Sequence, residues 1–141
     1  MNAYARSADA YLAQRILGAN PVQQAALIME AGQLHLGKAI RALAQGDLTR
    51  AGESFLRVTE VLAEAKARIN LEEGGELATS LENLYDWWAS EIMAACNDRS
   101  IARLESVAQA MGDIRQAWQQ LHEKQAKAGM GLPLQYEDQV V

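Results

Sequence analysis

The 141-residue sequence has a single cysteine, two prolines and no long apolar run. With Cys96 alone, neither an internal disulfide nor a zinc site built from cysteines can form, a usage consistent with a reducing compartment. No apolar stretch approaches the ~20 residues needed to span a bilayer, and Met1 to Ala10 lack the basic and apolar regions of a signal peptide. We therefore expect a soluble, cytoplasmic protein with no membrane insertion.

Positive charge is also scarce. The 13 Lys and Arg residues are outnumbered by 18 acidic ones, giving a net charge of -5, and they are scattered instead of forming a basic stripe. Such a chain repels a phosphate backbone, so we expect no nucleic-acid partner. Half of the residues are apolar and 22% are charged, which is typical of one globular domain with a single core.

The few helix breakers divide the chain into helices, because alternating β-branched strand patterns are missing. Asn20-Pro21 supplies a cap and a preset first turn, predicting a helix that ends near Gln45. Gly46-Asp47 provides a left-handed terminator and the next cap, and predicts a second helix over Leu48–Ile69. This tight connection makes the two helices antiparallel.

Two later breaks define two more helices. The first break spans Asn70 to Gly75, and the second is Asn97-Asp98, where Asp98 is the expected N-cap of a helix reaching about Lys124.

Apolar residues recur at three- and four-residue steps in the last three of these helices, so each helix buries one face. The stripes are Leu48, Ala51, Phe55, Val58, Leu62, Ala65 and Ile69; Leu77, Leu81, Leu84, Trp88 and Ile92; and Leu104, Val107, Met111, Ile114, Trp118 and Leu121. The sequence therefore predicts an all-α fold, an antiparallel four-helix bundle over residues 19–124.

Two segments lie outside this bundle. Residues 1–18 form a short amphipathic helical segment, with Tyr4, Tyr11, Leu12 and Ile16 at helical spacing. Residues 125–141 hold two glycines and a proline and end in a polar, acidic run, so we expect a flexible tail.

Catalytic and metal-binding patterns fail on spacing. A di-iron carboxylate bundle needs Glu three residues before His, but Gly32 precedes His35 and Gln119 precedes His122. Cys96 lies among Ala and Asn residues with no activating base nearby in sequence. We expect no enzyme activity, no metal and no cofactor.

One enzymatic alternative remains open. His35 followed by Lys38 resembles the phosphorelay histidine of four-helix phosphotransfer domains, in which the histidine faces solvent. The match is partial, because glycine stands at 37 and alanine at 39, the reverse of the usual order of a bulky residue and then glycine.

The adjacent indoles of Trp87 and Trp88 cannot face one core, because neighbouring helix positions point about 100° apart. Trp88 belongs to the apolar stripe, whereas Trp87 shares a face with Ser80, Asn83 and Glu91. Trp87 is thus either exposed in a groove or packed beneath the N-terminal segment, and both alternatives imply an apolar groove outside the main core.

Residues Glu73 to Asp86 read EGGELATSLENLYD. This segment resembles the flagellin export chaperones (FliS-type), in which a Gly-Gly-Glu turn leads into a helix bearing Asn-Leu-x-x-Leu-Tyr-Asp. Further matches lie in the same order along residues 2–122: Ala3-Tyr4, Ala19-Asn20-Pro21, Gly46-Asp47, Ala94 to Asp98, and Ala117-Trp118. There are departures: Met29 and Glu30 stand where the family shows Tyr-Asp, and Trp87-Trp88 replaces a common Tyr-Met.

The resemblance implies a function in protein binding. A chaperone of this kind binds the disordered C-terminal segment of flagellin, prevents premature polymerisation and delivers it to the flagellar type III export apparatus. The implied partners are flagellin and export gate components, with a monomer or a homodimer formed by exchange of the N-terminal segment. The partner-binding residues that we expect are Tyr4, Tyr11, Leu12, Ile16, Met29, Glu30, Asn83, Tyr85, Asp86 and Trp87.

Overall fold

The computed structural model describes residues 20–69 and 71–131, with side chains described for 20–69 and 74–128. This part of the chain is all-helical. It consists of α2 (Pro21–Ala44), α3 (Leu48–Ala67), α4 (Leu71–Asn97) and α5 (Ile101–Gly131). The predictions about residues 1–18, including Tyr4, Tyr11, Leu12 and Ile16, lie outside the described residues, as does the end of the tail after 131.

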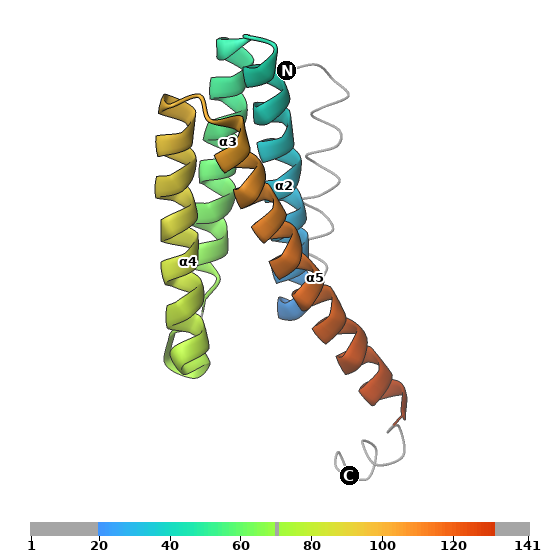
Figure 1. The fold of residues 1–141 in the computed structure, drawn as a ribbon. Coiled ribbons are helices and arrows are strands. Elements are labelled where there is room, and N and C mark those ends of the chain that lie inside the picture. The colour runs from blue at the N-terminus through green and yellow to red at the C-terminus, as the bar shows by residue number, and fades with distance from the viewer. Residues whose placement is uncertain (1–19, 70, 132–141) are drawn as a thin grey trace.

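The four helices form an antiparallel ring. α2 packs against α3 and α5, and α4 packs against the same two helices. In Figure 1, α4 and α5 lie close together at the turn that joins them and diverge toward the opposite end, where α5 extends past the other helices. The described helices include none that is long and apolar enough to cross a membrane.

The predicted start of α2 and the turn after it are confirmed. The Asn20 side chain accepts a hydrogen bond from the Gln23 amide at 2.8 Å, and Pro21 is the first helical residue. Gly46 has φ of +76°, and the Asp47 amide donates back to the Ala42 carbonyl, which is the Schellman arrangement. Asp47 then caps α3.

The predicted cap of the last helix is wrong by two residues. α5 begins at Ile101, and the Ser100 hydroxyl, not Asp98, faces the Arg103 amide at 3.4 Å. The Asp98 carboxylate instead accepts from the Arg103 guanidinium at 2.8 Å. Arg99 between them has φ of +54°, so this turn is a second Schellman motif with arginine at the position that usually holds glycine.

Two other boundaries differ from the prediction. α4 begins at Leu71 and is interrupted by Gly75, whose φ of +57° and ψ of -132° suit glycine. Of the break predicted over Asn70 to Gly75, the structure therefore has the interruption at Gly75. α5 continues seven residues past Lys124 to Gly131, because residues 125–128 (Gln-Ala-Lys-Ala) are good helix formers. The tail predicted to start at 125 is therefore partly helix.

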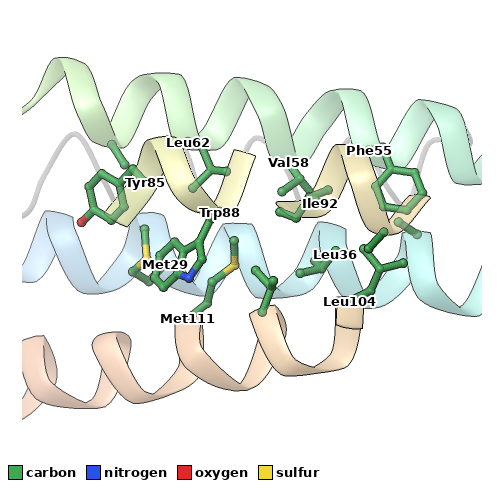
Figure 2. Close-up of a cluster of buried hydrophobic side chains, with 14 of the residues drawn as sticks. Met29, Leu36, Phe55, Val58, Leu62, Tyr85, Trp88, Ile92, Leu104 and Met111 are labelled. Carbon is green, nitrogen blue, oxygen red and sulfur yellow. The ribbon is translucent and has the colours of Figure 1, made fainter. Parts of the chain in front are cut away.

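The core runs along the bundle axis between the four helices (Figure 2). Trp88 is 1% exposed and lies between Met29 and Met111, both fully buried, where the soft thioethers pack around the indole. Tyr85 stands at the end of this row, 5.7 Å from the Trp88 ring, with its hydroxyl directed away from that indole.

The ends of the predicted stripes are not buried. Leu48, Leu77 and Leu121 are 52%, 62% and 41% exposed, because the helices that would cover them have ended or diverged at these levels.

Candidate functional site

An open cavity of about 340 Å³ lies at the end of the bundle where α2 begins and α3 ends. Its wall is mainly apolar and comes from all four helices. The lining residues are Pro21, Val22, Gln24, Ala25, Ile28, Ala65, Arg68, Ile69, Gly74, Leu77, Ala78, Leu81, Tyr85 and Trp118.

The cavity exists because the core is underfilled at this end. Ala25, Ala65 and Ala78 are among its lining residues. Buried alanines such as Ala42, Ala51 and Ala95 also lie at the other end, where they belong to one core cluster with Phe55 and Leu104. α5 has diverged from α4 at this level and contributes Trp118 alone to the described lining. The divergence of α5 thus leaves apolar surface accessible at this end.

A short polar network borders the cavity. The Arg68 guanidinium donates to the Gln24 amide oxygen at 2.9 Å, linking the end of α3 to the start of α2. Its Nε donates to the Glu64 carboxylate at 2.7 Å, one helical turn earlier. Arg68 is the one charged residue among the described lining residues, so the border carries a cationic group that is held in place.

Tyr85 and Trp118 form the inner wall between α4 and α5. Tyr85 is 4% exposed, and burial raises the pKa of its hydroxyl, while the nearby Trp118 N–H lowers it by a smaller amount. That N–H approaches the hydroxyl without reaching hydrogen-bond geometry. The Trp118 Nε1 is buried and finds no hydrogen-bond partner in the described part of the chain.

The outer side of α4 carries three predicted binding residues. Trp87 is 56% exposed, which agrees with its expected position outside the main core, and Asn83 and Asp86 are exposed as well. The Asp86 carboxylate accepts from Lys66 of α3 at 2.9 Å, and this hydrogen bond together with the opposite charge raises the Lys66 pKa. These three residues do not line the cavity.

The other predicted residues divide between core and surface. Met29 is fully buried beside Trp88, so no partner can touch it while the bundle is closed. Glu30, the next residue, is half-buried. Of the predicted residues that the structure describes, Tyr85 is the one that lines the cavity.

His35 does not occupy the position that phosphotransfer requires. Its side chain is 8% exposed, whereas a phosphorelay histidine must be open to a partner's phosphoryl group. Among the described residues, no group of three His, Cys, Asp or Glu side chains lies together as a metal site would require.

Sequence reasoning missed most of the cavity wall. Alanines at 25, 65 and 78 line the cavity, but buried alanines at 42, 51 and 95 lie near helix ends at the filled end of the bundle, so this residue type does not distinguish the two ends. The space stays open because α5 diverges from α4. The apolar spacing of α5 does not show where this divergence begins.

Comparison with known proteins places this architecture in a family. The chain matches the family model described as "Flagellar protein FliS" over residues 3–125. It is 28% identical over 110 residues to the flagellar secretion chaperone FliS of Salmonella typhimurium, covering 77% of this chain and 82% of the relative. It is also 28% identical over 85 residues to the Vibrio cholerae chaperone of the same name, covering 60% of this chain and 61% of that relative.

A third relative is the flagellar secretion chaperone FliSB of Pseudomonas aeruginosa, 22% identical over 104 residues, which cover 74% of this chain and 82% of the relative. Because the family model spans most of the chain, from the residues before α2 well into α5, this protein belongs to the FliS family of flagellar proteins.

Proposed function

We propose that this protein is a cytoplasmic chaperone that binds the disordered C-terminal segment of flagellin, prevents its premature polymerisation and delivers it to the flagellar type III export apparatus. The family supports this assignment, and the observation that carries it is the open apolar cavity at one end of an otherwise filled bundle. Apolar surface that the fold leaves accessible is what a chaperone for an unstructured segment needs.

The binding mode follows from helix geometry. A client segment that folds as an amphipathic helix presents apolar side chains at i, i+3, i+4 and i+7 and can place them along a groove between helices. Ordering such a segment costs ~2–5 kcal/mol of the gross contact energy. The cavity and the exposed Trp87 provide apolar contacts that offset this cost.

The roles proposed for individual residues follow from their positions. Tyr85 contacts the client from the cavity wall, and Trp87, Asn83 and Asp86 contact it along the outer side of α4. Glu30 contributes from α2, and Met29 supports the site from within the core.

The N-terminal segment completes this proposal. Tyr4, Tyr11, Leu12 and Ile16 cover part of the apolar surface when the client is absent, and exchange of this segment gives a homodimer. The loaded chaperone then docks on export gate components.

A matched pair of leucine variants tests the cavity. Leu77 is 62% exposed and lines the cavity, while Leu48 is 52% exposed at the first residue of α3 and does not line it. We expect Leu77→Ser to weaken binding of the flagellin C-terminal segment of the same organism by about 5- to 30-fold, because roughly 1–2 kcal/mol of apolar contact is lost. Leu48→Ser should bind as wild type.

Isothermal titration calorimetry with the purified segment gives both affinities. Absence of any binding by the wild-type protein would refute the proposed function. Equal losses in the two variants would show that the cavity is not the site.

A further inference from the structure

The polar groups at the cavity are hydrogen-bond donors. Arg68 carries five N–H groups and no acceptor, and its described hydrogen bonds use the Nε and Nη1 positions. The Gln24 oxygen is occupied by Arg68, which leaves its NH₂ group to donate. Trp118 adds a buried N–H that finds no partner among the described residues. The cavity therefore offers donors whose complement is an acceptor.

The charges nearby point the same way. The described lining residues include no carboxylate, and Arg68 is their one charged member. The Glu64 carboxylate pairs with the Arg68 Nε at 2.7 Å, so Nη2 and the second hydrogen of Nη1 remain to donate to another acceptor. The Asp86 carboxylate on the neighbouring face of α4 is occupied by Lys66 at 2.9 Å. A carboxylate entering beside Arg68 thus meets a donor-rich border, and hydrogen bonds between ionised partners are about twice as strong as neutral ones.

The volume of the cavity limits the size of the apolar client side chain that it can hold. An apolar cavity of about 150 Å³ is large enough for a benzene molecule. A space of about 340 Å³ with an apolar wall accommodates at least one large aliphatic or aromatic side chain.

From these observations we infer that the client segment seats a large apolar side chain in this cavity and carries, within one helical turn of it, an aspartate or glutamate whose carboxylate accepts hydrogen bonds from Arg68. This inference rests on the proposed function and adds a sequence requirement on the client. Arg68 is then a specificity-determining residue of the chaperone, and the Trp118 N–H donates a hydrogen bond to a second oxygen of the same segment.

The experiment is a double-mutant cycle. The probe is the flagellin C-terminal segment, with each Asp changed to Asn and each Glu to Gln one at a time, titrated against wild type and against Arg68→Gln. We expect one acidic position, next to a large apolar residue, whose amide form binds wild type about tenfold more weakly and binds Arg68→Gln no more weakly than the parent segment does. Arg68→Lys should retain part of the coupling.

Arg57→Gln is the matched control, because Arg57 lies on the same helix, bonds to Glu60 at 3.3 Å and is absent from the cavity wall. Circular dichroism melts of each variant establish that Arg68→Gln stays folded at the titration temperature. If wild type binds the segment but no acidic position couples to Arg68, the inference is wrong and the proposed function stands. If wild type does not bind the segment, both are wrong.

Discussion

Arg99 has a backbone conformation that most side chains avoid. It occupies the C′ position of α4 with φ of +54°, and its exposed side chain makes no hydrogen bond or ion pair in the described part of the chain. The left-handed conformation costs roughly 1–2 kcal/mol for an L-residue, and glycine removes this cost while gaining some entropy in the unfolded chain. We expect Arg99→Gly to raise the free energy of unfolding by about 0.5–1 kcal/mol in urea titrations.

Arg99→Ala is the control, since it removes the same side chain and keeps the Cβ. An equal gain in both variants would show that the side chain, and not the backbone, is responsible.

Tyr85 makes stability depend on alkaline pH. Its folded-state pKa is raised by burial above the ordinary value near 10, so the unfolded chain releases this proton first. The stabilisation is complete below about pH 10 and is lost as pH rises through the folded-state pKa. The raised pKa of Lys66 acts in the same direction. We expect the free energy of unfolding to fall as pH rises above about 10, and to fall less steeply in Tyr85→Phe.

Urea titrations at several pH values compare the two slopes. A Tyr85→Phe slope identical to that of wild type would contradict this assignment.

Local signals were read correctly where one residue type decides the geometry. Asn20, Pro21, Gly46 and Asp47 perform the capping and turn roles that their chemistry predicts. The turn before α5 was misread because Asp98 and Ser100 are both good caps, and the choice between them depends on Arg103, which draws the Asp98 carboxylate away. The local sequence contains all three residues, but not the geometry in which Arg103 reaches both Asp98 and Glu91 of α4.

At the scale of helices, α2 and α5 pack against each other at a crossing that has a glycine on each helix, Gly32 on α2 and Gly112 on α5. A Cβ on Gly112 would lie 2.6 Å from the Gln33 amide nitrogen, which donates to the Ala108 carbonyl at 3.0 Å, whereas a Cβ on Gly52 of α3 meets nothing within 4 Å. We expect Gly52→Ala to stabilise the protein by about 0.5–1 kcal/mol through helix propensity. Gly112→Ala should be about 0.5–1.5 kcal/mol less stable than Gly52→Ala, because it displaces the end of the Gln33 side chain from its acceptor.

Thermal or urea denaturation measures both variants. Equal stabilisation by the two alanines would show that Gln33 moves aside at no cost and that this crossing is not sterically tight.

Helix number, order and antiparallel direction could be predicted, as could the start of α2 and the turn between α2 and α3, because stripes and breakers report them directly. The start of α4 and both ends of α5 could not. The Leu121 position continues the apolar stripe of α5, yet it is 41% exposed because α5 has diverged from α4 by then. An apolar period shows which face of a helix is favoured for burial. It does not show along how many turns the neighbouring helix packs against that face.

For the whole molecule, we expect one of the two adjacent tryptophans to contribute to stability and the other to client binding. Trp88 is 1% exposed at the centre of the core and Trp87 is 56% exposed. We expect Trp88→Ala to reduce the free energy of unfolding by about 3–5 kcal/mol. Trp87→Ala should change it by less than about 0.5 kcal/mol while weakening binding of the flagellin segment. Urea titration and calorimetry on the same preparations give both quantities, and unchanged affinity of Trp87→Ala would exclude that indole from the client site.

The candidate site was predictable in part. The pattern placed Trp87 outside the core and Trp88 inside it, as the structure has them. Met29 was expected to bind the partner from its place in the family motif, but it is fully buried, because α2 packs this side chain against Trp88. The cavity itself arises from four helix segments that are distant in sequence, so no single motif reports it.

The two Schellman turns lie together at one end of the bundle, and the cavity lies at the other. Since the two turns hold the helices together at one end, we expect small changes in helix crossing angle to alter the spacing of the helices more at the cavity end than at the turns. We therefore expect one bundle to accept client side chains of different sizes in the cavity. Backbone amide hydrogens near the cavity should exchange with solvent sooner than those beside the two turns.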